Sequence, residues 1–387
     1  MEKTRIDTSS LSFFRFLNIA IIVFLHYGIR ENPHLTHYAR AGSIIVFFYM
    51  LSGFVLFLGC QRKGRLDWSQ YLLKRGISIL PLYYIGFVVF LAILIYMDNF
   101  SLTGFLLALF CVQAWVPGYQ HYINPPSWFV SGLLFFYVIF PLLFARIRKT
   151  SPDAGKLLLS SIWLWIVTVV ILNIGFNPNY FSGYFLPYFA FIESFPLANF
   201  CSFYMGVCGA YYLSERPLQR RPENSFQSLF STIAVLFLFT LTLTIHYHEG
   251  IGNFMQARLP YEAGLHAPIV LLLIINLCTE KNVLTRLFSM KGLMTLGVIS
   301  YSLYILQAPV YAIFMKFVAQ PLAMGSLQAF VLFFVSLIII ASVATVLENV
   351  AVKRCFSRIL RPVTGKSTTP DSALGQSNRL QSSKAGE

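Results

Sequence analysis

Charged side chains are scarce in this sequence. Asp, Glu, Lys and Arg make up 11% of the 387 residues, whereas hydrophobic residues make up 57%. Soluble domains carry roughly 25% charged residues, so this composition excludes an ordinary water-soluble domain. Many apolar runs reach the roughly 18 residues that can cross the hydrocarbon core of a bilayer. We therefore predict an all-α polytopic membrane protein surrounded by membrane lipids.

Cysteine and acidic residues are also few. The six cysteines lie almost entirely inside apolar runs and show no metal-like pairing, so neither a disulfide framework nor a metal site is predicted. The net charge is +14, but Lys and Arg occur in short clusters between apolar runs. Such clusters are typical of the loops that set membrane topology. We therefore predict no nucleic-acid partner.

The N-terminus has a basic start followed by an apolar run, as a signal peptide does. However, the run lacks a small-residue cleavage site and contains Arg15, Asn18 and His26. We expect it to be retained as the first span.

Eleven apolar segments are visible: 11–28, 41–60, 77–97, 102–117, 127–145, 157–176, 195–213, 226–246, 263–279, 294–315 and 326–349. If all eleven crossed, two short basic loops, 146–156 and 216–221, would lie outside, against the positive-inside rule. Segment 102–117 is short and ends at Pro117, so we expect a re-entrant or interfacial helix there. About ten transmembrane helices then remain, with both termini in the cytoplasm. We predict a transmembrane domain over 1–361 and a disordered cytoplasmic tail over 362–387.

Two ionisable residues lie within the first predicted span, where charge is costly and often functional. Arg15 and His26 are eleven residues apart, about 16 Å along a helix and nearly three full turns. They should therefore share one side, with Arg15 near the inner end. An arginine there suits a phosphate-bearing ligand and a histidine suits proton transfer. The alternatives are an Arg15 side chain that reaches to the interface and a His26 that only joins two helices.

Further polar residues interrupt the apolar runs. Ser52 could either pack helices or line a cavity, and the basic pair Lys74 and Arg75 could either anchor a helix or bind phosphate. Trp128 could be an interfacial aromatic residue. Segment 296–310 contains Tyr301 and a polar stripe of Ser300, Tyr304 and Gln307, which could form a structural seam or line a wet cavity.

Six motifs occur in a fixed order along residues 9–350. They comprise Arg15 and His26; Phe47, Phe48, Ser52, Gly53 and Phe54; Lys74, Arg75, Pro81, Leu82 and Tyr83; Gln113, Trp115 and Pro117; Trp128, Ser131, Phe136, Tyr137 and Pro141; and the run 296–304. Together they resemble the acyltransferase-3 family of membrane O-acyltransferases. The resemblance implies transfer of an acyl group, often acetyl, from cytoplasmic acyl-CoA to a hydroxyl of an extracytoplasmic glycan.

The sequence departs from the family pattern at three positions. Many members have a second arginine where this chain has Ser78, a glutamate where it has Leu133 and a histidine where it has Gln307. These differences suggest a divergent branch, for example one that acts on exopolysaccharide. They leave open a changed acceptor or an inactive protein.

On this basis we predict an acyl-CoA-dependent O-acetyltransferase of the bacterial inner membrane, without a permanently bound cofactor. Its acceptor would be a cell-surface glycan or a lipid-linked oligosaccharide. His26 would be the general base, Arg15 would orient the donor or stabilise negative charge, and Lys74 and Arg75 would contact the CoA phosphates. The expected cavity residues are Ser52, Trp128, Ser131, Ser300, Tyr301, Tyr304 and Gln307. The alternative functions are a transporter or flippase of lipid-linked sugars and, less well supported by the loop lengths, a glycan polymerase.

Overall fold

The computed structural model describes residues 6–29, 42–63, 66–175, 189–215, 223, 225–244 and 263–360, and only the backbone at 63, 189, 190, 244, 263 and 351–360. The chain divides into two compact units, residues 1–345 and 346–387, and the last helix runs across the boundary. The predicted tail, 362–387, lies outside the described residues.

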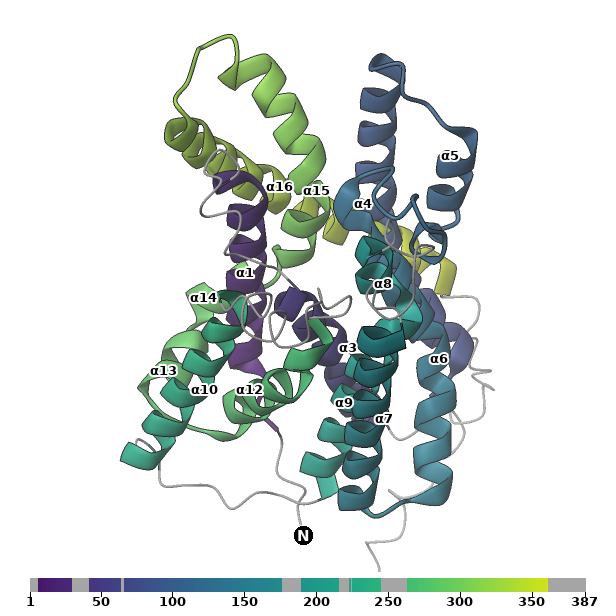
Figure 1. Cartoon of the computed structure of the whole chain (residues 1–387), viewed down its shortest axis with the longest axis vertical. Helices are drawn as coiled ribbons and strands as arrows, with labels where there is room; N and C mark the ends of the chain where they lie inside the picture. The colour runs from purple at the N-terminus through teal and green to yellow at the C-terminus, as the bar shows by residue number, and fades with distance from the viewer. Residues whose placement is uncertain are drawn as a thin grey trace, which may run out of the picture. The chain divides into compact units, whose positions relative to one another are not determined.

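The described residues form helices and no β-strand, as predicted for an all-α protein (Figure 1). The elements are α1 (Ser9–Val23), the π-helix η1 (Phe24–Gly28), α3 (Gly42–Lys63), α4 (Trp68–Tyr96), α5 (Leu102–Leu109), the 3-10 helices η2 (Gln113–Trp115) and η3 (Pro125–Ser127), α6 (Trp128–Thr150), α7 (Ala154–Gly175), α8 (Phe189–Ser194), α9 (Pro196–Glu215), α10 (Phe226–Thr244), the 3-10 helix η5 (Ala263–His266), α12 (Ala267–Thr279), α13 (Val283–Phe288), α14 (Lys291–Leu296), α15 (Ser300–Phe314), the π-helix η6 (Met315–Ala319) and α16 (Ser326–Leu360).

Eight helices in the described ranges are long and apolar enough to cross a membrane. They coincide with eight of the ten predicted spans. The other two predicted spans correspond to α9, which is rich in small and polar residues, and to the helix Gly264–Thr279, which is shorter. The count of ten therefore stays a prediction.

Segment 102–117 contains the eight-residue helix α5 and the short helix η2, and it is not among the eight candidate spans. The hydroxyls of Tyr83 and Tyr84 on α4 donate hydrogen bonds to the carbonyls of Ala108 and Leu109 at the end of α5. These bonds hold the segment against α4. Its short helices agree with the expectation that it does not cross.

The centre of the first unit is a close crossing of α3 and α9, which lie side by side in Figure 1, with α7 packed on α9. A Cβ atom added to Gly206 would lie 2.0 Å from the Met50 carbonyl oxygen, and one added to Gly53 would lie 2.3 Å from that of Phe203. Only glycine permits this approach of the two backbones. Gly53 therefore serves close helix packing, and the neighbouring Ser52 is held beside it.

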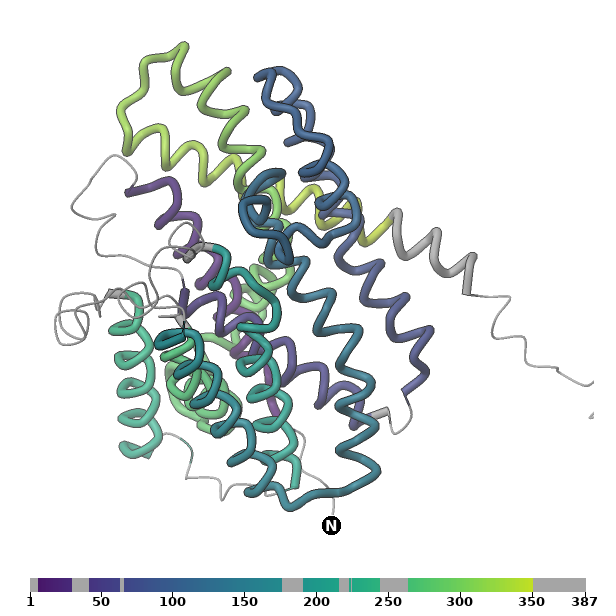
Figure 2. The backbone as a smooth tube through the Cα atoms, turned by 45° about the vertical axis from the view of Figure 1, so that its right-hand side comes forward, coloured from purple at the N-terminus to yellow at the C-terminus, as the bar shows by residue number. Residues whose placement is uncertain are grey.

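Helix α1 packs on α13 and α14 near its start and on α15 further along (Figure 2). A Cβ atom on Gly297 would lie 2.1 Å from the Ser12 carbonyl oxygen, so the start of α1 is in close contact with the turn before α15. Beyond Val23 the helix continues as a π-helix, where the ring of Tyr27 lies 4.2 Å from that of Tyr311. Aromatic contacts therefore hold the end of α1 against α15.

The linker between η2 and α6 is fastened by buried polar groups. The side-chain amide of Gln113 donates a hydrogen bond of 3.2 Å to the Ser127 hydroxyl. The side-chain amide of Asn124 donates one of 3.0 Å to the Ile305 carbonyl. The Tyr304 hydroxyl donates to the Pro126 carbonyl at 2.8 Å. Asn124 has φ +50°, a left-handed conformation that Asn adopts more readily than most residues. The linker is thus held on the middle of α15.

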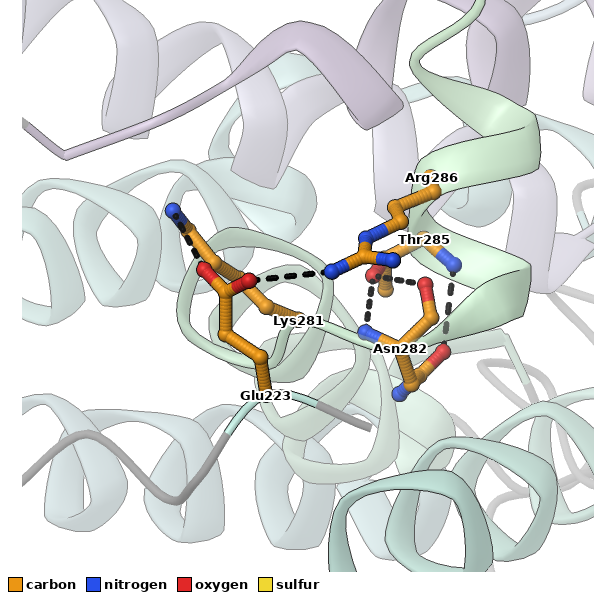
Figure 3. Close-up of polar contacts among 5 residues, drawn as sticks. All are labelled: Glu223, Lys281, Asn282, Thr285 and Arg286. Atoms are coloured by element: carbon orange, nitrogen blue, oxygen red, sulfur yellow. Dashed lines mark hydrogen bonds and ion pairs between the residues drawn. The ribbon is translucent and has the colours of Figure 1, made fainter. Parts of the chain in front are cut away.

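A separate polar cluster lies at the turn between α12 and α13 (Figure 3). Glu223 forms ion pairs with Lys281 at 3.4 Å and Arg286 at 2.9 Å. Asn282 caps α13, because its side chain accepts from the Thr285 backbone while the Thr285 side chain accepts from the Asn282 backbone. One carboxylate thus joins two cations beside the helix cap, which indicates a structural role.

Candidate functional site

A cavity of about 230 Å³ lies among α1, α3, α4, α6 and α15. Its walls are mostly apolar. The polar residues that line it are Arg15, Ser52, Arg75, Ser78, Tyr137, Ser300, Tyr301 and Tyr304. Five different helices therefore bring polar groups to one cavity within an apolar bundle.

Two guanidinium groups make this cavity electropositive. Arg15 donates one long hydrogen bond, 3.4 Å from its Nη2 to the Gly297 carbonyl. The guanidinium of Arg75 lies 5.7 Å from the ring centres of Tyr71 and Tyr137, in cation–π geometry. No Asp or Glu is among the described residues that line the cavity. Two cations without a lining carboxylate suit an anionic or strongly polarised ligand.

The polar stripe of α15, Ser300, Tyr304 and Gln307, contacts two different parts of the site. Ser300 and Tyr304 line the cavity, whereas Gln307, one turn further along, is fully buried and reaches His26 instead. The Ser300 hydroxyl donates to the Gly297 carbonyl, and the Tyr301 hydroxyl donates to the Ile79 carbonyl on α4, each at 2.8 Å. The stripe thus connects the cavity with the end of α1.

His26 is exposed and lies in the π-helix that ends α1. Its Nδ1 lies 3.2 Å from Oε1 of Gln307, while Nε2 of Gln307 donates to the Tyr304 carbonyl at 2.8 Å. Because a carbonyl can only accept, the second bond orients the amide and leaves Oε1 to accept from His26. The proton of a neutral His26 therefore lies on Nδ1, and Nε2 carries an open lone pair. An imidazole whose Nδ1 proton is held by a hydrogen bond, and whose Nε2 stays an acceptor, can serve as a general base.

Arg15 and His26 occupy different parts of the site. Arg15 lines the cavity, but His26 does not. The eleven-residue spacing was expected to align them on a regular α-helix, whereas residues 24–28 form a π-helix with a different pitch. What connects the two residues is α15, through Tyr304 and Gln307.

The other predicted residues divide between the cavity and its surroundings. Lys74 is exposed and does not line the cavity, although its neighbour Arg75 does. Trp128 is half-buried, and Ser131 is buried with no hydrogen-bond partner for its hydroxyl among the described residues. Both lie on α6 outside the cavity lining.

The departures from the family pattern fall at the site itself. Leu133 and Ser78 line the cavity, so the positions of the missing glutamate and arginine face the same space as Arg15 and Arg75. Gln307 contacts His26 directly. The amide thus stands where many members would place a second imidazole, beside the candidate base.

Sequence reasoning missed His121, which lies in the fastened linker before α6. Its Nδ1 is 3.2 Å from the Pro125 carbonyl, and its ring lies 6.2 Å from that of Trp128. Desolvation by the neighbouring protein atoms lowers the pKa of His121 from its ordinary value of 6.5, and the hydrogen bond with the Pro125 carbonyl partly opposes this shift. The sequence feature that could have pointed to His121 is its place in a polar linker directly before the Asn-Pro-Pro-Ser-Trp motif.

The described part of the chain has eight candidate spans, and several of them line a cationic cavity. These features define the class of polytopic membrane proteins with a polar site among their helices. A family model described as an acyltransferase domain matches residues 8–346. The chain therefore belongs to the acyltransferase-3 family, as its motifs indicated.

A curated relative agrees with this family. The chain is similar to acyltransferase MdmB from Streptomyces mycarofaciens, with 31% identity over 128 residues. The match covers 30% of this chain and 32% of the relative, so the chain spans about a third of that protein's length. No solved structure matches.

Proposed function

We propose that the protein is an acyl-CoA-dependent O-acyltransferase that moves an acetyl group from cytoplasmic acetyl-CoA to a hydroxyl of a cell-surface or lipid-linked glycan. Membership of the acyltransferase family supports acyl transfer. The donor, the acceptor, the bacterial inner membrane and the cytoplasmic placement of both termini are parts of the proposal.

The observation that carries the proposal is the hydrogen bond of 3.2 Å between His26 and Gln307. It fixes the imidazole in the tautomer whose Nε2 can accept a proton from a hydroxyl. A histidine that only joined two helices would not need an open Nε2, and His26 is exposed.

The cavity beside the middle of α1 supports a donor site. With the N-terminus in the cytoplasm, Arg75 and Arg15 would lie toward the inner face, and acyl-CoA would enter from there. Arg75 would contact a CoA phosphate and Arg15 would orient the donor or stabilise the charge on the thioester oxygen. Lys74, exposed beside Arg75, would contact phosphate outside the cavity.

The reaction balances with these groups. His26 Nε2 takes the proton of the acceptor hydroxyl, whose oxygen attacks the thioester carbonyl carbon. The carbon–sulfur bond breaks, an ester forms on the acceptor, and the CoA thiolate receives the proton from His26. The proposal requires no metal and no permanently bound cofactor.

The test compares the acetyl content of the surface glycan in a deletion strain complemented by wild type or by His26→Ala. We expect acetylation with wild type and a fall of at least about 100-fold in transfer with the variant, since a general base contributes about 10² to 10⁴. Membrane abundance of the two proteins is the control.

Two results would contradict the proposal. Equal acetylation by both proteins would remove His26 as the base. Unchanged acetylation on deletion, together with stalled glycan export, would favour a flippase.

A further inference from the structure

The linker before α6 carries a second histidine, His121, that the reaction described above does not use. His121 belongs to the linker that Asn124 and Pro126 fasten to Ile305 and Tyr304 on α15. Those two α15 residues lie within one turn of Gln307, the hydrogen-bond partner of His26. The same stretch of α15 therefore supports both histidines.

The tautomer of His121 follows from its contact with Pro125. The Pro125 carbonyl can only accept, so the neutral imidazole carries its proton on Nδ1, 3.2 Å away. Its Nε2 consequently has an open lone pair, and no hydrogen bond to this atom occurs among the described residues. His26 is in the same state, with Nδ1 bonded to Gln307.

The two imidazoles are held from one stretch of α15. The Pro126 carbonyl of the linker that carries His121 accepts a hydrogen bond from Tyr304, and Gln307, one turn further along, holds His26. Both side chains are exposed. Two imidazoles, each bonded through Nδ1 and each with Nε2 left as an acceptor, are thus supported by the same stretch of α15, although they come from elements about a hundred residues apart in the chain.

We propose that His121 binds the acceptor, by accepting a hydrogen bond at Nε2 from a hydroxyl next to the one that His26 deprotonates. Two adjacent hydroxyls are characteristic of sugars, and each can donate to one imidazole. His121 thereby selects an acceptor with neighbouring hydroxyls and places one of them at His26. It takes no proton in the reaction.

The anchoring of the linker supports binding of a ligand. Buried polar bonds from Gln113, Asn124 and Tyr304 hold the backbone around His121, so the imidazole is preorganised before an acceptor arrives. Trp128, whose ring is perpendicular to that of His121, limits the ring on one side. A free surface histidine would lack both restraints.

This inference rests on the proposed function, and one experiment separates the two. Purified protein in lipid nanodiscs receives acetyl-CoA and surface glycan isolated from the deletion strain. The rate of CoA release and the ester content of the glycan are followed as the glycan concentration rises. Wild type, His26→Ala, His121→Ala and His121→Gln are compared, with thermal midpoints as the folding control.

We expect His121→Ala to raise KM for the glycan about tenfold, the effect of losing one hydrogen bond of typical strength, and to change kcat much less. His121→Gln keeps an acceptor at the end of the side chain and should recover part of this loss. His26→Ala should instead lose kcat.

The results separate as follows. If His121→Ala leaves KM for the glycan unchanged, or lowers kcat without raising KM, His121 is not an acceptor-binding residue, even where His26→Ala is inactive. If wild type transfers no acetyl group to the glycan, the proposed function fails and this inference falls with it. If His121→Gln is as impaired as His121→Ala, the open nitrogen is not what matters.

Discussion

Two regions beside α1 carry polar groups of different kinds. At the middle of the helix, Arg15 and, on α4, Arg75 border an apolar-walled cavity, where they contact a carbonyl and aromatic rings. Near its end, His26 and, on the linker before α6, His121 are exposed imidazoles whose Nδ1 atoms are each bonded to an oxygen. The first region offers positive charge and the second offers lone pairs.

This difference suggests a division of work along one helix. Fixed cations suit a donor that carries phosphates, and lone pairs suit an acceptor that carries hydroxyl protons. The polar stripe of α15 joins the regions, because Ser300 and Tyr304 face the cavity and Gln307 contacts His26. A variant that affects only one region should therefore change only one substrate's kinetics.

The largest of the following effects is expected at the imidazole region. Gln307→Leu keeps the size of the side chain but removes the acceptor that fixes the His26 tautomer, so kcat should fall about 30-fold to 100-fold. The measurement is turnover of acetyl-CoA and isolated glycan in nanodiscs. Ser302→Ala is the matched control, since it deletes another buried hydrogen bond on α15, to Thr345, without touching His26. Equal losses in both variants would mean that packing of α15 alone is responsible.

A smaller effect is expected at the cationic region. Arg75→Ala should raise KM for acetyl-CoA about tenfold, because Arg75 lines the cavity. Lys74→Ala, the adjacent exposed cation, should raise it less than about threefold, because solvent and salt screen its charge. Steady-state kinetics at fixed glycan concentration give the KM for acetyl-CoA of both variants and allow the two values to be compared. A larger effect at Lys74 would place the phosphates outside the cavity.

The smallest effect is expected at Glu223, which belongs to neither region. Hydrogen bonding to Lys281, and then to Arg286, holds the pKa of Glu223 below its ordinary value of 4.5. Because the folded state favours the charged carboxylate, its stabilisation is present above pH 4.5 and is lost as the pH falls through the lowered pKa. Glu223→Gln should therefore lower the thermal midpoint slightly at pH 7 and low salt.

The same comparison at acid pH checks the sign of this effect. The wild-type and Glu223→Gln thermal midpoints should converge on acidification and in high salt, while acetyl transfer stays at the wild-type rate. A difference that grew with acidification would contradict the ion-pair explanation, and a loss of transfer would link the cluster to the site.

Some side chains of the candidate site could be singled out from the sequence because their signals are local. Arg15 and His26 stand out as ionisable residues in an apolar run. Of the expected cavity residues, Ser52, Ser300, Tyr301 and Tyr304 line the cavity, whereas Trp128, Ser131 and Gln307 do not. Lys74 and Arg75 could not be separated by sequence, since adjacent residues on a helix point about 100° apart and only packing shows which one faces inward.

The sequence by itself determined that this is an all-α membrane protein of the acyltransferase-3 family, because composition and ordered motifs need no knowledge of contacts. It did not determine how the site is divided. The π-helix at 24–28, the bond between Gln307 and His26 and the anchoring of the His121 linker on α15 depend on which helices pack together. Only the tertiary structure decides those, because residues far apart in the chain meet at positions set by the close crossing of whole helices.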